Sequence, residues 1–504
     1  MFGAAIVFLY FFGLTIPLVG PDEPRYAQVA REMFARGDWI TPTLGGFNWF
    51  EKPALLYWLE IASYGLFGVS EFAARFGSAL FGLGTIGSLW MLGRCVESEE
   101  NKPFADWLAL LAATSIGMIV FSRAASFDII LTFPMTAALS CFYLYDRQRR
   151  AAVRRSLLPL AAFYFFVGVA VLAKGLVGIV FPYAIVTVYL LYIRQKPSTQ
   201  LIFSIFWGTM LAAATASTWY LPIYLRHGWP FVDEFFIQHH FQRYTSNKYF
   251  HPQPFHFFFW VLPLMTLPWI PFFFAGIWRS VKVLLQRQPI SESERSLIIF
   301  SLIWLFIPLA FFSLSGSKLP GYILPALPPA IILASLSVRD LVTTRLRRRV
   351  ISLTAAATIF LVLAALIFVV PKYAPMDSTR ALFAAAEERG FGDAKVLSMH
   401  HVSHNAEFYA AGRLVRGPDG KQRNFLGPAE VYSEIMREGG RVVLVIVPRE
   451  YLTQLTNADY LRSEMIAENG ESALLAVAAI QPSAALRNLS INAFPIPVSS
   501  TVSQ

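Results

Sequence analysis

The sequence predicts a polytopic α-helical membrane protein with a small C-terminal α/β domain, and three observations lead to this fold class. Of the 504 residues, 56% are hydrophobic and 15% are charged, whereas soluble domains contain about 25% charged residues. Apolar runs close to the roughly 20 residues needed to cross a bilayer recur as far as residue 370. The arginines gather in short loops between these runs.

The apolar runs predict about eleven transmembrane spans in a membrane domain over residues 1–370. The predicted spans are 3–19, 72–92, 105–121, 128–145, 157–173, 175–193, 200–221, 256–278, 296–312, 321–337 and 350–370. The first run follows Met1 without a basic segment, and no small-residue cleavage site precedes Pro21. The sequence therefore favours a retained span over a removed signal peptide.

The net charge of +10 is explained by membrane topology, and no nucleic-acid partner is expected. Arginines crowd two short loops, at 147–155 and 345–349, and the basic loops of a membrane protein face the cytoplasm. This orientation places the N-terminus in the cytoplasm. The loops placed outside are 20–71, 122–127, 222–255 and 313–320. The two cysteines, Cys95 and Cys141, offer neither a disulfide framework nor a metal-binding pattern.

The long outer loop at 20–71 predicts two helices that lie in the membrane interface rather than across it. After Asp22, which is placed to cap a helix, apolar and polar residues follow a helical spacing until Gly37 ends the pattern. The apolar side carries Tyr26, Val29, Ala30, Met33 and Phe34, and the polar side carries Arg25, Gln28, Arg31, Glu32 and Arg36. A second interfacial segment follows Pro53 and ends near Gly68.

From about residue 371 the composition becomes more polar and the apolar runs shrink to strand length. Short buried strands are predicted at 395–399, 442–447 and 474–480, and helices between them at 378–389, 428–438 and 449–456. This alternation predicts a small extracytoplasmic α/β domain over residues 371–481. The tail at 482–504 is rich in Ser, Pro and Asn, a composition typical of disorder.

Ionisable residues gather at the predicted outer ends of the spans, where charge is costly and tends to be paired or functional. They are Asp22, Glu23, Arg25, Glu51, Lys52, Arg123, Asp128, Lys174, His239, His240, Arg243, Tyr244, Lys318 and Tyr322. Taken singly, each has an ordinary explanation: Asp22 caps a helix, and Lys174 and Lys318 extend towards lipid headgroups. Their convergence on one face instead suits a site where cations grip a phosphate and a carboxylate handles a hydroxyl.

Five stretches of the sequence, which together cover most of residues 1–337, resemble a known family. They are PDEPRYAQVAREMFARGDWITPTLGGFNWFEKPALLYWLEIASYGLFGVSEFAARFGSAL, SRAASFDIILTFPMT, VLAKGLVGIVFP, QHHFQRYTSNKYFHPQPFHFFF and SGSKLPGYILPALPP. In these stretches the chain resembles the aminoarabinose (4-amino-4-deoxy-L-arabinose) transferases of lipid A and their bacterial protein-mannosyltransferase-like relatives. The resemblance implies a glycosyltransferase C fold with about 11–13 transmembrane helices, since family members often have two more than the runs counted here.

The resemblance also implies an undecaprenyl-phosphate-linked sugar as donor, an active site facing the periplasm and a place in the bacterial inner membrane. It implies that Asp22 is the main catalytic carboxylate and that Asp128 is a second aspartate lining the cavity. Glu51 matches a metal-contacting glutamate, so a divalent metal ion is the one cofactor left open. The groups matched to the carrier phosphate are Arg25, Lys52, Arg243, Tyr322 and one of His239 and His240, and Lys174 and Lys318 are further cations at the same face.

The predicted function is an inverting glycosyltransferase that moves a sugar from undecaprenyl phosphate to a lipid, glycan or protein acceptor, with aminoarabinose and lipid A as the first candidates. If the acceptor is a hydroxyl, Asp22 can remove its proton, which is worth about 10²–10⁴-fold in rate. If the acceptor is a phosphate, the nucleophile is already anionic, and Asp22 orients or binds rather than acting as a base. A polyprenyl-lipid transporter or flippase is the alternative from another class, although the sequence has no internal repeat. A non-catalytic scaffold would not need these charges together.

Overall fold

The computed structural model describes residues 2–97, 103–150, 156–194, 197–242 and 252–480. The chain divides into two compact units, Met1–Ala374 and Pro375–Gln504, and each is described by itself. The predicted disordered tail at 482–504 lies outside the described residues.

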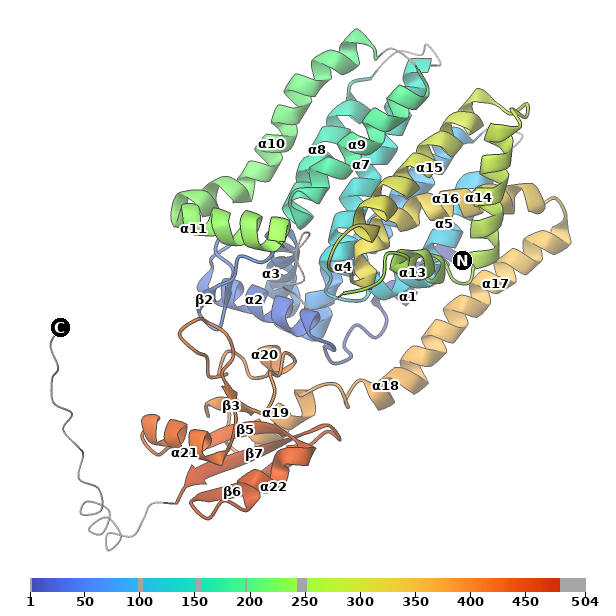
Figure 1. Cartoon of the computed structure of the whole chain (residues 1–504). Coiled ribbons are helices and arrows are strands. Elements are labelled where there is room, and N and C mark those ends of the chain that lie inside the picture. The colour runs from blue at the N-terminus through green and yellow to red at the C-terminus, as the bar shows by residue number, and fades with distance from the viewer. Residues whose placement is uncertain (1, 98–102, 151–155, 195–196, 243–251, 481–504) are drawn as a thin grey trace, which may run out of the picture. The chain divides into compact units, whose positions relative to one another are not determined.

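The first unit is helical apart from one two-stranded hairpin (Figure 1). Its elements are α1 (Phe2–Phe11), α2 (Asp22–Arg36), β1 (Thr43–Leu44), β2 (Phe47–Asn48), α3 (Leu55–Phe67), α4 (Glu71–Val96), α5 (Phe104–Thr114), α6 (Ile116–Ser122), α7 (Phe127–Arg150), α8 (Leu158–Lys174), α9 (Val177–Tyr192), α10 (Thr199–His227), α11 (Trp229–Val232), η2 (Asp233–Gln242), α13 (Phe257–Met265), α14 (Ile270–Leu285), α15 (Glu292–Ser313), η3 (Pro320–Ala326), α16 (Leu327–Leu341), α17 (Arg345–Ala364), η4 (Ala365–Val369) and α18 (Val370–Tyr373).

Helices occupy every predicted span, and the predicted polytopic helical fold is confirmed. Among the described residues, six helices are long and apolar enough to cross a membrane, or eight if each of two bent pairs forms one span. This number is lower than the predicted eleven because several apolar helices are short. Helices α8 and α9 have only 17 and 16 residues, and α1 has 10.

Two of the predicted spans are broken rather than straight. The run at 105–121 forms α5 and α6, which meet at Ser115 with a bend of 60°. The run at 256–278 forms α13 and α14, which are bent by 113°. The first run at 3–19 is also helical only as far as Phe11, because Gly13 adopts φ 70° and ends the helix.

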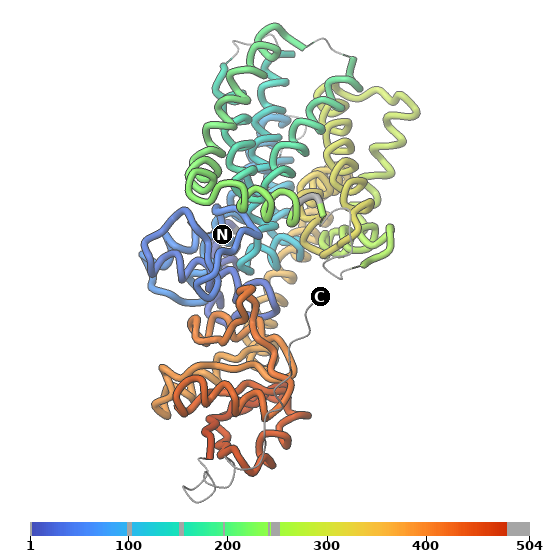
Figure 2. The backbone as a smooth tube through the Cα atoms, turned by 60° about the vertical axis from the view of Figure 1, so that its left-hand side comes forward, coloured from blue at the N-terminus to red at the C-terminus, as the bar shows by residue number. Residues whose placement is uncertain are grey.

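The centre of the membrane unit is the group of helices α7 to α10, which run side by side in two views (Figure 1 and Figure 2). Helix α8 packs against α7, α9 and α10, and α4 covers another side of α7. Small residues allow the close crossings: a Cβ at Gly168 would lie 2.6 Å from the carbonyl oxygen of Ala212, and one at Gly178 would lie 2.3 Å from the Ala170 backbone. Helices α7 and α8 also pack along each other, and the start of α7 lies next to the end of α8.

The loop at 20–71 forms the predicted helices α2 and α3, which pack against each other. Helix α2 ends at Gly37 in the left-handed conformation with φ 63°, as the sequence predicts. The prediction that Asp22 caps this helix is wrong: Pro21 holds the cap position and Asp22 is the first helical residue. The cap therefore does not explain why a carboxylate stands at this position.

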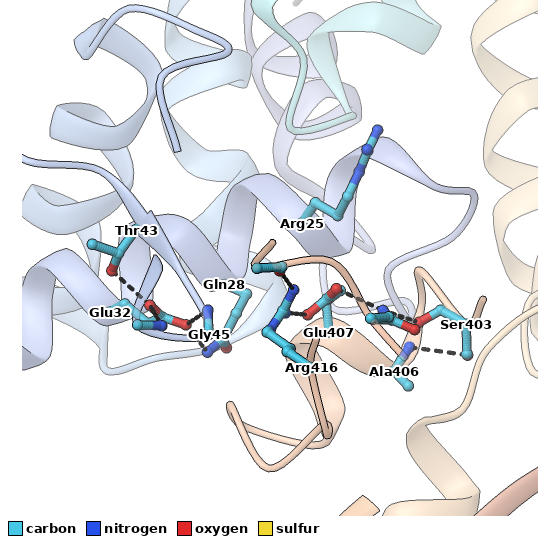
Figure 3. A network of polar contacts seen from close by, with 12 residues as sticks. Arg25, Gln28, Glu32, Thr43, Gly45, Ser403, Ala406, Glu407 and Arg416 are labelled. Carbon is cyan, nitrogen blue, oxygen red and sulfur yellow. Dashed lines mark hydrogen bonds and ion pairs between the residues drawn. The ribbon is translucent and has the colours of Figure 1, made fainter. Parts of the chain in front are cut away.

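The second unit is a small α/β domain, as predicted, built on a five-stranded sheet of order β4-β3-β5-β7-β6 (Figure 1). Its elements are α19 (Arg380–Glu388), β3 (Val396–Met399), α20 (Ala406–Tyr409), β4 (Asn424–Phe425), α21 (Pro428–Arg437), β5 (Val443–Pro448), η5 (Arg449–Tyr451), α22 (Leu452–Thr456), β6 (Leu461–Glu468) and β7 (Ser472–Ala479). Strand β3 pairs in parallel with β4 and β5, and β7 pairs antiparallel with β5 and β6. A buried ion pair between Arg416 and Glu407 supports the loops beside β3 (Figure 3).

Candidate active site

Asp22 begins α2 and forms an ion pair with Arg25, one helical turn further on. The Arg25 side chain is 18% exposed, whereas the Asp22 side chain is 47% exposed, so this carboxylate is open to a ligand. The Arg25 Nε also donates to the carbonyl oxygen of Pro21 at 2.9 Å, which fixes the guanidinium against the start of the helix. The pair therefore offers one accessible carboxylate beside one oriented cation.

Glu51 and Lys52 follow the β1–β2 hairpin and form a second ion pair, with 3.2 Å between Nζ and Oε1. Both side chains are nearly buried, at 10% and 11% exposure. The hairpin itself is held by Glu32 of α2, which accepts hydrogen bonds from the Thr43 hydroxyl and the Gly45 amide at 2.6 Å each (Figure 3). The polar side of α2 thus sets the position of the segment that carries this second pair.

The first two pairs lie within electrostatic reach of each other. Burial works to lower the pKa of Arg25, but the negative charges of Glu51 and Asp22 outweigh burial, and the pKa lies above its ordinary value. Burial also raises the pKa of Glu234 in η2, and the charge of Glu51 adds to this effect against a hydrogen bond from the Phe50 amide. Asp22, Arg25, Glu51 and Glu234 therefore surround one region at the end of the helices.

A third ion pair joins Asp128 at the start of α7 to Lys174 at the end of α8, and both side chains are 17% exposed. The Lys174 Nζ lies 4.8 Å from the centre of the Tyr322 ring in η3. Gly321 is required beside them, since a Cβ there would come within 1.8 Å of the Asp128 Oδ2. Three residues predicted from separate loops, Asp128, Lys174 and Tyr322, are thus brought together.

Aromatic packing links this third pair to the first outer loop. The rings of Tyr26 in α2 and Tyr57 in α3 both meet the Phe127 ring edge to face, with centroids 4.9 Å and 5.4 Å away. Phe127 directly precedes Asp128, so α2, α3 and α7 share one buried contact next to the site. This contact was not predicted, because the sequence gives no sign of which aromatic rings meet across the fold.

The remaining predicted residues are less closely associated. Lys318 is 6% exposed and donates to the carbonyl oxygens of Ser315 at 2.6 Å and Gln253 at 3.0 Å, so it is turned into the protein rather than towards lipid headgroups. His239 is half-buried in η2. Arg243 and the side chain of His240 lie outside the described residues. The predicted roles of these residues in phosphate binding stay predictions.

Glu23 is among the charges predicted at the span ends, but the sequence did not predict its partner. Glu23 forms a two-pronged ion pair with Arg75 of α4, with 2.9 Å from Nε to Oε1 and 2.7 Å from Nη2 to Oε2. The two residues are 52 positions apart, and Arg75 lies within a predicted span, where its charge is the only signal in the sequence. A charge inside an apolar run usually has a buried partner.

The described residues do not form a recognisable metal site. No three His, Cys, Asp or Glu side chains in the described ranges stand close enough together to hold a metal ion. Glu51, the predicted metal contact, is instead paired with the ammonium group of Lys52. The described residues thus give no support to a metal ion at Glu51, which stays a prediction.

Comparison with known proteins agrees with the family that the sequence resembles. Residues 14–238 match the family described as dolichyl-phosphate-mannose-protein mannosyltransferase. The predicted family resemblance is confirmed. The part of the chain that matches these mannosyltransferases contains Asp22, Glu51, Asp128 and Lys174, whereas Lys318 and Tyr322 come after it.

Two curated relatives carry the name undecaprenyl phosphate-alpha-4-amino-4-deoxy-L-arabinose arabinosyl transferase. The protein from Aeromonas salmonicida is 30% identical over 67% of this chain and 59% of its own length. The protein from Yersinia enterocolitica is 29% identical over 82% of this chain and 74% of its own length. The chain thus spans only about six tenths of the length of the Aeromonas relative.

The fold matches that of a solved structure. The crystal structure of ArnT from Cupriavidus metallidurans bound to undecaprenyl phosphate matches with a TM-score of 0.75, over 94% of this chain and 97% of that chain. The sequence identity is 23%, so this likeness concerns the fold alone. Because the match extends over nearly the whole chain, it confirms the predicted combination of a helical membrane domain with a small C-terminal domain.

Proposed function

We propose that this protein is an integral membrane glycosyltransferase that moves a sugar from undecaprenyl phosphate to an acceptor at the periplasmic face of a bacterial inner membrane. The observation that carries the proposal is the arrangement of three ion pairs, Asp22–Arg25, Glu51–Lys52 and Asp128–Lys174, at the ends of α2, β2 and α7. Each pair combines a carboxylate with a cation. The names of the curated relatives supply the donor class.

The cations serve the leaving group in the proposed reaction. When the bond between the anomeric carbon and the carrier phosphate breaks, negative charge grows on the phosphate oxygens. Arg25 is held by a hydrogen bond to the Pro21 carbonyl and by its pair with Asp22, and Lys52 by its nearly buried pair with Glu51, so both cations are oriented before the charge develops. Removing one such preoriented donor typically costs about 10²–10³-fold in rate.

Asp22 serves the incoming nucleophile. Its carboxylate is the most exposed of the three, and it stands beside the cation expected to meet the phosphate. If the acceptor is a hydroxyl, Asp22 takes the proton as the oxygen attacks the anomeric carbon, and the configuration is inverted. If the acceptor is a phosphate, as in lipid A, the nucleophile is already an anion and Asp22 orients the sugar instead. No step is routed through a metal ion.

Aminoarabinose and lipid A are the first candidates for sugar and acceptor, because the curated relatives are named for the aminoarabinose donor. Transfer of another sugar to a protein hydroxyl is the second candidate, and the matched family description, a protein mannosyltransferase, supports it. In either case the basic loops near residues 150 and 345 are placed in the cytoplasm, with the N-terminus. The ion pairs and the C-terminal domain then face the periplasm.

The test is expression in a polymyxin-sensitive host that lacks its own aminoarabinose transferase, followed by mass spectrometry of lipid A. An added mass of one aminoarabinose, lost in the Asp22→Asn variant, is the expected result. Unmodified lipid A from well-folded protein would count against this acceptor and favour the second candidate. Modification that survives Asp22→Asn would overturn the role given to Asp22.

A further inference from the structure

The guanidinium of Arg75 forms hydrogen bonds with the chain segment that connects α1 to α2. Its Nη1 donates to the carbonyl oxygens of Leu14 at 3.0 Å and Ile16 at 2.5 Å, and its Nη2 donates to that of Pro17 at 3.0 Å. The Arg75 side chain is 2% exposed. A cation so fully removed from water is stable only when its donors are satisfied, and these carbonyls satisfy several of them.

The partner carboxylate, Glu23, ties a second segment to the same point. Its Oε1 accepts the amide of Ala125 at 2.7 Å as well as Arg75 Nε, and its Oε2 accepts the amide of Val19 at 3.3 Å as well as Arg75 Nη2. Ala125 belongs to the short link between α6 and α7. One buried carboxylate thus holds the entry to α2 and the entry to α7 against α4.

These two entries carry the carboxylates of the proposed site. Asp22 is the residue next to Glu23, and Asp128 lies three residues after Ala125. Any loosening of the Glu23–Arg75 pair would therefore change the separation between Asp22 and Asp128. A displacement of about 1 Å between reacting groups can cost about 100-fold in rate, so a rigid link of this kind has a catalytic value beyond stability.

We propose that Glu23 and Arg75 form a positioning pair that sets Asp22 and Asp128 at their working separation. The inference rests on the proposed transferase function. Neither residue touches substrate in this account; they act through the backbone of Val19 and Ala125.

The chain offers a matched carboxylate, Glu294, that stands outside the proposed site. Glu294 of α15 accepts hydrogen bonds from Arg279 of α14 and Arg339 of α16, and its side chain is 14% exposed, close to the 10% of Glu23. It joins three helices as Glu23 joins three segments. None of the proposed site residues belongs to these three helices.

The test compares Glu23→Gln with Glu294→Gln in the full-length protein, with Arg75→Lys as a third variant. Glutamine keeps the shape of glutamate but removes the charge, and lysine keeps the charge of Arg75 but not its fork of donors. Transfer from the undecaprenyl-phosphate-linked sugar is measured per folded molecule, with kcat and KM obtained separately. Amide hydrogen exchange is followed by mass spectrometry in peptides that contain Val19 and Ala125.

For Glu23→Gln we expect kcat to fall about 10- to 100-fold, with KM for the donor changed by less than about threefold. Amide exchange at Val19 and Ala125 should accelerate about tenfold or more. In Glu294→Gln, neither kcat nor this exchange rate should change. An unchanged kcat per folded molecule in Glu23→Gln would overturn the proposal. If Glu23→Gln does not fold, kcat is measured in Arg75→Lys instead. A lowered kcat per folded molecule then supports the proposal, and an unchanged kcat overturns it.

Failure of the proposed function is recognised separately. It would appear as wild-type protein that transfers no sugar, while the exchange at Val19 and Ala125 would still respond to Glu23→Gln. Amide exchange at Val19 and Ala125 that stays slow in both Glu23→Gln and Arg75→Lys would overturn the positioning role, whatever the wild-type activity.

Discussion

The two ends of helix α7 each carry an aspartate, and the two carboxylates are held in different ways. Asp146, near the end of α7, is bound by Arg149 at 2.8 Å and Arg150 at 2.7 Å and by the hydroxyl of Tyr189 at 2.8 Å. Its side chain is 2% exposed. Asp128, about 27 Å away along the helix axis, pairs with Lys174 and is 17% exposed.

The difference separates structural carboxylates from those available for chemistry. A carboxylate has about four acceptor positions, and Asp146 has most of them filled by protein donors. The same is true of Glu23. Asp22 and Asp128 are more exposed and retain capacity for a ligand. On this view, removing charge at one end of α7 affects the rate, and removing it at the other end affects the fold.

The largest expected effect is the loss of transfer rate when Asp128 is replaced. Asp128→Asn should lower kcat by about 10²–10⁴-fold, because it removes a carboxylate from the reacting centre and releases Lys174. The free energy of unfolding should fall by less than in Asp146→Asn, since the Asp128 side chain is 17% exposed and that of Asp146 is 2% exposed. The rate is measured with detergent-purified protein, and Asp146→Asn is the control. A small effect of Asp128→Asn on kcat would contradict the assignment of Asp128 to the reacting centre.

The opposite result is expected for Asp146→Asn. Its removal leaves Arg149 and Arg150 partly buried without a counter-charge, which typically destabilises a protein by about 3–5 kcal/mol. The melting temperature should fall, while kcat per folded molecule stays within about twofold. A thermal denaturation series in one detergent provides the measurement. Loss of activity in protein that melts normally would show that this end of α7 also takes part in the reaction.

A substitution at Gly321 tests whether the position of Asp128 matters, without changing any charge. In Gly321→Ala the new Cβ meets the Asp128 carboxylate, so the Asp128–Lys174 pair must move. A shift of about 1 Å should lower kcat by up to about 100-fold. Gly87→Ala in α4 is the matched control, because its Cβ meets nothing within 4 Å and alanine favours a helix. Equal rates in the two variants would argue that the position of Asp128 is not critical.

Elements with a strong local pattern were the ones that the sequence predicted. Helix α2 and its end at Gly37 follow from a clear apolar stripe and a glycine, and strands β3, β5 and β7 are continuous apolar runs. Strand β6 was missed because it lies at the edge of the sheet, where charged and apolar residues alternate with irregular burial. Its sequence has no buried run to reveal it.

The site was predictable in its composition but not in its pairings. The charges at span ends identified Asp22, Asp128 and Lys174, because charge near a membrane needs a reason. Which carboxylate meets which cation depends on how the helices cross, and single residues do not encode that. The pairing of Glu23 with Arg75 across 52 residues is the clearest example.

One further carboxylate differs from all of those above, because it is buried and no hydrogen-bond partner is found for it among the described residues. Glu60 of α3 is fully buried, and neither of its carboxyl oxygens has a hydrogen-bond partner in the described part of the chain. Burial raises the pKa of Glu60 well above its ordinary value, and the negative charge of Glu23 adds to the effect. We therefore expect Glu60 to be a neutral acid in the folded protein.

The smallest effect of Glu60→Gln is expected below about pH 4, because glutamine resembles the protonated acid that is then present in both the folded and the unfolded protein. Since the pKa is raised on folding, the contribution of Glu60 to stability is complete below its unfolded pKa of about 4.3 and is lost as the pH rises through the folded pKa. Wild-type protein should therefore lose melting temperature relative to Glu60→Gln as the pH rises above about 5. Glu292→Gln, at a side chain that is 73% exposed, should run parallel to wild type. Parallel curves for Glu60→Gln as well would mean that Glu60 is already ionised in the fold, and that a buried carboxylate here tolerates its charge.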